Sequence, residues 1–349
     1  MVITRSIKEW ILARPRAGSV YEFLPPMRLY RTAPEFLDAH CADSSCFPDS
    51  FLLPEKYLAR LRHPIITGYD GLLVLPDGSF ARESVWGSKQ LRARTDGRYL
   101  DPATVVFQTG RFYSLFFIFC REFYHWFTDV LLRLHEILER LPEDVRFLVP
   151  ATLGAAQREG LKRLGIADER LLQFDGRVPW RLEELWFTPN INGKVGINPP
   201  AVAWLRERIL SAVKPDGIRL RLYVSRTGTK GRRVLNEKAL RPVWESFGFQ
   251  TVVGHRLSLG EQVEMFSRAE AVVGAHGGAL TNLLYSPPGT RVLELHVQND
   301  VREHFYSLSA AAAHSYQAIS GPGQINLWKQ SDFTIDPGVF ERALARLLA

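Results

Sequence analysis

Residues 271–297, AVVGAHGGALTNLLYSPPGTRVLELHV, decide the predicted fold. An apolar run (271–273) leads directly into a histidine and two glycines, and the pattern then becomes helical until the turn at 287–290 and a second apolar run. Apolar runs that alternate with short helical segments are typical of parallel strands joined by crossover helices. The stretch therefore predicts part of an α/β sheet, with His276, Gly277 and Gly278 at the carboxyl end of a strand, where such sheets bind ligands.

The same alternation continues on the N-terminal side of this stretch. Residues 218–225 alternate as a strand, residues 237–247 follow the helical period, and residues 249–253 form another apolar run. Ser258 and Glu261 have the spacing of a capping box, which predicts a helix over 259–269. The sequence thus predicts a parallel sheet covered by helices on both faces.

Length and composition indicate a soluble protein with two domains. The 349 residues exceed the usual size of one core, and 46% hydrophobic with 23% charged residues is ordinary for a packed chain. Three cysteines form neither a disulfide framework nor a paired metal-ligand pattern. We find no membrane-spanning run and no signal-peptide pattern. We expect a cytoplasmic protein, and the net charge of +7 leaves peripheral attachment at the inner face of the membrane open.

Gly277 and Gly278 predict a phosphate-binding turn. Glycines between a strand and a helix let the backbone approach a ligand and present unpaired N–H groups at the helix start, where the helix dipole adds positive charge. His276 can donate a hydrogen bond to a phosphate oxygen or to a leaving group. The alternative interpretation is a tight turn followed by structural packing of the histidine.

A basic loop is expected at the same edge of the sheet. Residues 219–233, RLRLYVSRTGTKGRR, contain six basic residues and no acidic one, and Arg226, Lys230, Arg232 and Arg233 follow the end of a predicted strand. An arginine fork binds two phosphate oxygens at once. We therefore predict that this loop and the glycine turn hold one phosphate group, the alternative being a solvated basic loop. The basic stretch contains one aromatic residue, Tyr223, and not the series of interleaved aromatic residues typical of nucleic-acid binding, which argues against a nucleic-acid partner.

The clearest predicted helix is 121–140, REFYHWFTDVLLRLHEILER, whose apolar residues form a single stripe. His125 and Asp129 lie on the other side of that helix and one turn apart. Such a pair can act as a general base, with one residue orienting the other. Which of the two is the base stays open, and the alternative is a solvated or ion-paired helix face.

Metal chemistry is not expected. We find no Asp-x-Asp motif and no cluster of His, Cys, Asp or Glu with metal-ligand spacing. A P-loop and a G-x-G-x-x-G fingerprint are also missing, which argues against nucleotide hydrolysis and dinucleotide binding. We therefore expect no cofactor and no metal, and cationic side chains would neutralise the phosphate charge.

Three stretches resemble the shared blocks of glycosyltransferase family 61: YVSRTGTKGRRVLNE (223–237), SLGEQVEMFSRAEAVVGAHGGALTNLLYSPPGTRVLEL (258–295) and FYHWFTDVLLRL (123–134). The resemblance implies a GT-B architecture, in which two Rossmann-like domains face a cleft, and an inverting, metal-independent transfer from a nucleotide-sugar donor, expected to be UDP-linked. It places the catalytic side at His125 and Asp129. On the matching positions it implies these donor-binding residues: Ser225, Arg226, Lys230, Arg233, Asn236, His276, Gly277, Gly278, Ala279, Asn282 and Glu294.

The sequence and the resemblance together give a domain scheme and a function. We expect an N-terminal extension (1–60), an acceptor-side α/β domain (61–213), a donor-binding Rossmann-like domain (214–335) and a C-terminal helix (336–349) that packs back on the N-terminal domain. Asn236 is as well explained as a helix cap, and Glu294 as a contact of a ribose or of a buried arginine. The expected acceptor is a glycan or lipid-linked glycan of a surface polysaccharide. The alternative is a non-catalytic module that binds a nucleotide or a sugar phosphate.

Overall fold

The computed structural model describes residues 3–85, 101–214, 216–323 and 331–349, and its chain divides into two compact units. Unit 1 comprises residues 1–27 and 54–191, and unit 2 comprises residues 28–53 and 192–349. The predicted α/β class is confirmed in its broad form, because both units combine sheets and helices. Among the described residues no helix has both the length and the apolar character needed to cross a bilayer.

Unit 1 is built on a large mixed sheet with the strand order β1-β9-β8-β7-β13-β10-β11-β12, in which β6 also pairs with β13 and β2. Strands β13, β10, β11 and β12 are parallel to one another, whereas β6 and β7 run antiparallel to β13. Its elements are β1 Thr4–Arg5, α1 Ile7–Leu12, η1 Pro15–Ala17, β2 Gly18–Leu24, β6 Lys56–Arg62, β7 Ile65–Thr67, β8 Leu72–Val74, β9 Phe80–Ala81, η2 Arg82–Ser84, η4 Pro102–Thr104, β10 Val106–Ser114, α4 Phe123–His125, η5 Trp126–Val130, η6 Leu131–Leu134, η7 Leu138–Arg140, β11 Arg146–Pro150, α5 Ala155–Arg163, η8 Asp168–Arg170, β12 Leu171–Phe174 and β13 Trp180–Phe187.

Unit 2 contains a fully parallel six-stranded sheet with the order β15-β14-β16-β17-β18-β4. A separate two-stranded sheet joins β3 (Met27–Tyr30) to β5. The other elements are β4 Phe36–Leu37, α2 Ala39–Ala42, β5 Ser50–Leu53, α6 Pro199–Leu210, β14 Leu220–Val224, α7 Glu237–Ser246, β15 Phe249–Val252, η9 Gly254–Arg256, α8 Leu259–Phe266, β16 Ala269–Ala275, η10 Gly278–Tyr285, β17 Arg291–Val297, α9 His304–Ala311, β18 Ser315–Gly321 and α10 Pro337–Leu348.

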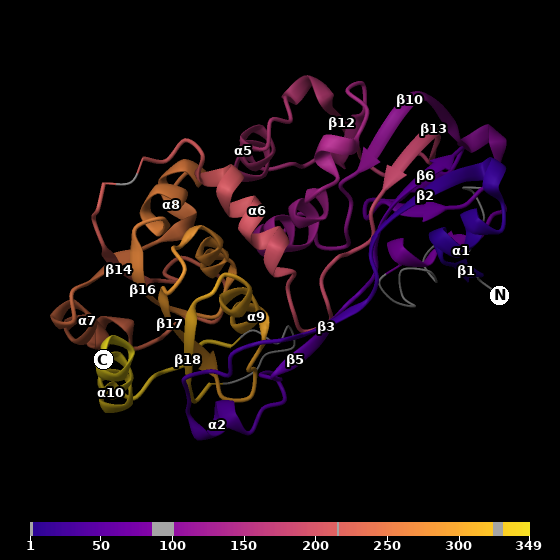
Figure 1. The fold of residues 1–349 in the computed structure, drawn as a ribbon. Coiled ribbons are helices and arrows are strands. Elements are labelled where there is room, and N and C mark those ends of the chain that lie inside the picture. Colours follow the sequence, from indigo (N-terminus) through magenta and orange to yellow (C-terminus); the bar gives the residue numbers. More distant parts are fainter. Residues whose placement is uncertain (1–2, 86–100, 215, 324–330) are drawn as a thin grey trace. The chain divides into compact units, whose positions relative to one another are not determined.

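Helices cover the parallel sheet of unit 2, as its alternating apolar pattern predicts (Figure 1). Helices α7 and α10 contact each other and pack on β15, β17 and β18, while η10 contacts α6, α8 and α9. One core cluster joins Tyr223 and Leu293 of the sheet to Trp244 of α7 and Phe340 of α10. The period of two along β17 then places Glu294 and His296 on the opposite face of the sheet from this cluster.

The expected domain boundaries differ from the two units. Residues 28–53 of the expected N-terminal extension belong to unit 2, where β4 pairs with β18 through Phe36↔Gln317 and Leu37↔Ala318. Helix α6, placed by the sequence in the first domain, also belongs to unit 2 and contacts η10 and α9. The C-terminal helix packs on α7, β17 and β18, where its apolar stripe completes the core of unit 2, and its expected docking on the N-terminal domain stays a prediction.

The expected helix over 121–140 is shorter and irregular. It begins as α4, continues through one π turn in η5, and ends in the 3₁₀ turn η6 at Leu134. Glu136 then adopts a left-handed backbone with φ 62°, which the apolar period does not reveal. A π turn inside a helix is frequent at functional sites, and this one carries Asp129.

Candidate active site

The strand order of unit 2 creates a topological switch point between β14 and β16. The connection that leaves the carboxyl end of β14 leads to β15 on one side, whereas the connection that leaves β16 leads to β17 on the other side. Open parallel sheets bind ligands in the crevice at this point. Ser225 and Arg226 follow β14, and His276 and Gly277 follow β16, so the basic loop and the glycine turn lie at the same edge.

The Arg226 side chain lies directly against Gly277. A Cβ atom built on Gly277 would overlap Nη1 of Arg226, so this contact requires a residue without a side chain. Nε and Nη2 of Arg226 donate hydrogen bonds of 3.0 and 2.8 Å to the Gly231 carbonyl, which fixes the guanidinium over the turn. Burial, together with nearby Arg232, lowers the pKa of Arg226 to about 10, so the group remains a cation near neutral pH.

The turn after Gly277 offers backbone N–H groups to a ligand. Helix η10 begins at Gly278, and the first N–H groups of a helix have no acceptor within it. A Cβ built on Gly278 would meet no atom within 4 Å, so the turn is open at this residue. Asn282 stabilises the turn from beneath, because its buried Nδ2 donates to the Ala279 carbonyl at 2.9 Å and to Gln262 at 2.6 Å. Asn282 is thus a structural residue of the predicted turn.

His276 belongs to a buried hydrogen-bonded group around Glu294. Nδ1 of His276 lies 2.5 Å from Oε1 of Glu294, and the Tyr316 hydroxyl donates to Oε2 at 2.6 Å. Nε2 of His296 lies 3.5 Å from the same Oε2 atom. Glu294 therefore has His276 and Tyr316 as its hydrogen-bond partners rather than the buried arginine considered for it, and its expected contact with a ribose stays a prediction. It orients His276 and selects the tautomer with a proton on Nδ1.

The charges of this group follow from its burial. Burial lowers the pKa of His276 to about 3, which outweighs the opposite influence of Glu294. Burial would raise the pKa of Glu294, but His296 and His276 outweigh it and hold that pKa below its usual range. Near neutral pH the site thus combines an ionised Glu294 with a neutral His276.

The same three side chains could hold a metal ion. Ligand atoms of His276, Glu294 and His296 all lie within 4.8 Å of one another, and two imidazoles with a carboxylate are a donor set that suits zinc. The sequence predicted no such cluster, because the residues come from two strands and only the Glu-x-His spacing of β17 signals it. Both carboxylate oxygens of Glu294 already accept short hydrogen bonds, from His276 and Tyr316, so the side chains satisfy one another.

Other residues predicted to bind the donor have structural partners. Arg233 forms an ion pair with Asp332, with Nε 2.9 Å from Oδ2. Asn236 exchanges two hydrogen bonds with the backbone of Ile335 and does not cap α7 with its side chain. Ser225 is buried and bonded to Glu237 and Thr227, whereas Lys230 is exposed. Arg233 and Asn236 therefore fasten the basic loop to the segment that precedes α10.

The predicted catalytic pair is formed in unit 1. Nδ1 of His125 lies 2.6 Å from Oδ2 of Asp129, and 21% and 13% of the two side chains remain exposed. The Phe117 and Phe119 rings lie 6.0 and 5.0 Å from the imidazole, centroid to centroid. A carboxylate bound to Nδ1–H leaves Nε2 of His125 as the proton acceptor, which is the arrangement of an oriented histidine base.

Acidification is expected to destabilise unit 2. Burial lowers the pKa of His276 to about 3 and that of His314 to about 4, so between these values and 6.5 the unfolded chain binds more protons than the folded chain. Stability must then fall as pH falls, by about 2 kcal/mol per histidine from about pH 7 to about pH 5. Urea unfolding at the two pH values tests this. His314→Gln should remove about half of the histidine contribution, and an undiminished pH dependence in this variant would contradict the assignment.

Much of this candidate site lies within a match to a known protein family. Residues 123–293 match the family described as Glycosyltransferase 61, which spans both the His125–Asp129 pair and the Arg226–Gly277 contact. The predicted family is thereby confirmed over these residues, and the match supports the predicted enzyme class, glycosyltransferase.

A curated relative supports the same family. The β-1,2-xylosyltransferase RCN11 of Oryza sativa subsp. japonica is 30% identical over 137 residues, which is 34% of this chain and 25% of the relative. The chain therefore covers about a quarter of the length of this relative.

Proposed function

We propose that this chain transfers a sugar from a nucleoside-diphosphate sugar to a hydroxyl group of a glycan acceptor. The observation that carries the proposal is the Arg226 guanidinium held against Gly277 at the switch point of a parallel sheet. A guanidinium that stays charged near neutral pH and the first N–H groups of a helix at the same edge suit a diphosphate leaving group. The proposal includes the GT-B arrangement expected from the family, with unit 2 as the donor-binding domain.

On the donor side, the contacts that bind the diphosphate also stabilise it as the leaving group. As the bond between C1 of the sugar and the phosphate oxygen breaks, its electron pair and negative charge pass to the diphosphate. Arg226 and the N–H groups at the start of η10 stabilise that charge without rearrangement, since the Gly231 carbonyl already fixes the guanidinium. His276, oriented by Glu294 with its proton on Nδ1, offers Nε2 as a neutral hydrogen-bond acceptor, which suits a hydroxyl group of the donor sugar or nucleoside. We propose that this site works without a metal ion.

On the acceptor side, His125 is the proposed base. The acceptor hydroxyl gives its proton to Nε2 of His125, and its oxygen forms the new bond to C1 on the face opposite the leaving group, which inverts the configuration. The Nδ1–Asp129 hydrogen bond supports this role for His125, because the carboxylate stabilises the imidazolium that forms. Asp129 is then the positioning residue of the pair.

For the substrates, we propose a UDP-linked donor and an acceptor glycan, free or lipid-linked, of a surface polysaccharide. A xylosyl donor is the first to test, because the rice relative is a β-1,2-xylosyltransferase. We place the reaction at the cytoplasmic face of the membrane, where the net charge of +7 favours peripheral contact with anionic lipids.

A donor panel tests the proposal. UDP-xylose, UDP-glucose, UDP-N-acetylglucosamine and GDP-mannose are each incubated with the chain and a cell-envelope extract, and release of nucleoside diphosphate is measured with and without EDTA. One UDP-sugar should be consumed at a rate that EDTA leaves unchanged. Binding of UDP without turnover of any donor would favour the non-catalytic module. Loss of turnover in EDTA that zinc restores would overturn metal independence and assign the metal to His276, Glu294 and His296.

A further inference from the structure

Unit 1 contains a polar pocket of about 400 Å³ that has no role in the proposed reaction. It lies on the sheet beside β6, β13 and the middle of β10, whereas His125 follows the carboxyl end of β10. Its lining includes Arg62, Arg111, Asp144, Glu183 and Glu184, so it offers both hydrogen-bond donors and acceptors.

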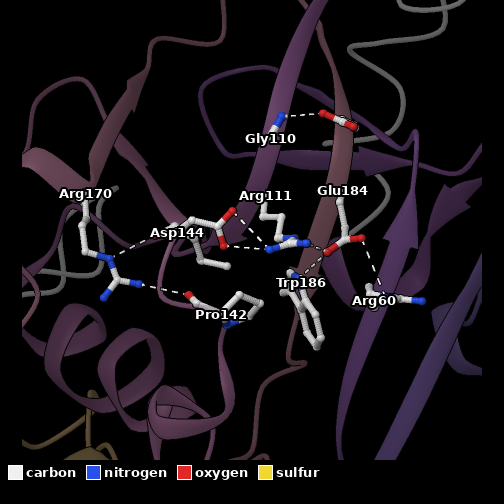
Figure 2. Close-up of polar contacts among 10 residues, drawn as sticks. Arg60, Gly110, Arg111, Pro142, Asp144, Arg170, Glu184 and Trp186 are labelled. Carbon is white, nitrogen blue, oxygen red and sulfur yellow. Dashed lines mark hydrogen bonds and ion pairs between the residues drawn. The ribbon is translucent and has the colours of Figure 1, made fainter.

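Strand register arranges these charges in one row. Glu184 of β13 lies opposite Arg62 of β6 and, on its other side, opposite Arg111 of β10. Arg111 pairs with two carboxylates (Figure 2). Its Nη1 lies 2.9 Å from Oδ1 of Asp144, and its Nε lies 3.5 Å from Oε1 of Glu184. Directly opposed residues on one sheet face are neighbours, so positive and negative groups alternate across the strands.

A β-bulge shapes the pocket beside this row. The pairing of β10 with β13 shifts between Gln108 and Arg111, and Gly110 adopts φ 105°, which favours glycine. The Gly110 N–H donates at 2.7 Å to Oε2 of Glu183, which fixes this carboxylate at the pocket (Figure 2). The bulge therefore converts a flat sheet face into a concave one with a positioned acceptor.

An aromatic surface adjoins the charged row. Trp186 is two residues beyond Glu184 on the same strand face and donates from Nε1 to Oε1 of Glu184 at 2.9 Å. The Tyr21 ring stacks on Trp186 at 6.1 Å between centroids and remains 48% exposed. A sugar ring has hydroxyl groups that both donate and accept hydrogen bonds and an apolar C–H face. Alternating charges beside an exposed aromatic ring match that combination.

We propose that this pocket is a glycan-binding site that holds neutral sugar units of the acceptor away from the reacting hydroxyl. Two arginines and three carboxylates line it, a nearly balanced set that favours a neutral glycan over an anionic one. The inference rests on the proposed function in one respect only, which is that the bound glycan is the acceptor of the reaction. Binding of a sugar chain at this face does not require the donor site.

The test uses the full chain and three neutral probes, xylohexaose, mannohexaose and chitohexaose, with binding measured by calorimetry. At least one probe should bind, and Arg62→Ala and Tyr21→Ala should each raise its Kd by about tenfold, the effect of losing one hydrogen bond to a charged group or one ring contact. Arg177→Ala is the matched control, since its side chain is 86% exposed outside the pocket lining, and it should leave Kd unchanged.

UDP binding by the same variants separates this inference from the proposed function. The Arg62 side chain of the pocket and the adjoining Tyr21 ring are both exposed, so the variants should fold and bind UDP as the parent does. Binding of none of the three probes by a chain that binds UDP would overturn the glycan site and leave the proposed function intact. Equal affinity of the parent and both pocket variants for a bound hexasaccharide would also overturn it.

Discussion

Replacing His125 with glutamine should lower kcat by about 10²- to 10⁴-fold, the usual contribution of a general base. Glutamine keeps the polar character and similar size of the side chain but cannot accept the proton at neutral pH. Asp129→Asn should also lower kcat, because the amide keeps a hydrogen bond to Nδ1 but no longer stabilises the imidazolium. The measurement is initial-rate kinetics with the donor that the panel identifies.

The kinetic signature distinguishes a base from a structural residue. UDP affinity should be unchanged in both variants, so the loss should appear in kcat and not in donor binding. His40→Gln is the control, because His40 is an exposed histidine of unit 2. A kcat within about threefold of the parent in His125→Gln would show that neither histidine chemistry nor its orientation by Asp129 limits the reaction.

The sheet of unit 2 could be predicted because its local signals agree with the fold. Each apolar run is bounded by a turn or a cap, and the Ser258–Glu261 capping box forms as expected at the start of α8. Asp336 likewise caps α10 by accepting from the Val339 N–H. The assignment of residues 28–53 to unit 2 could not be predicted, since the two-residue strand β4 is held by β18, almost 300 residues away in the sequence. Nothing in so short a segment specifies a distant partner.

The candidate site was predictable where residues directly follow neighbouring strands. The Arg226–Gly277 contact follows from two strands that end at one edge of the sheet. The roles of Arg233 and Asn236 could not be predicted, because their partners Asp332 and Ile335 lie 99 residues away. Tyr316 was missed for the same reason, as only pairing of β17 with β18 brings its hydroxyl to Glu294. Nonlocal side-chain pairing therefore limits what the motifs reveal.

Replacing Arg226 with alanine should weaken UDP binding by about 1.5–3 kcal/mol, or roughly 10- to 150-fold, the scale of lost hydrogen bonds to a charged group. Gly277→Ala should act through the same contact, because the added Cβ would occupy the position of Nη1 and displace the guanidinium. Both changes alter the donor side only, so the residual activity should still be lost when His125 is replaced with glutamine. Calorimetry with UDP gives the affinities.

Arg233→Ala is the matched control for these two changes, because it removes an arginine from the same loop whose charge is already paired with Asp332. If a general excess of positive charge attracted the nucleotide, Arg233→Ala and Arg226→Ala would weaken UDP binding equally and raised salt would abolish both effects. If the diphosphate instead binds at the Arg226–Gly277 contact, Arg226→Ala and Gly277→Ala weaken binding while Arg233→Ala does not. Unchanged UDP affinity in both Arg226→Ala and Gly277→Ala would remove the donor site from this edge of the sheet, and with it the proposed role of unit 2.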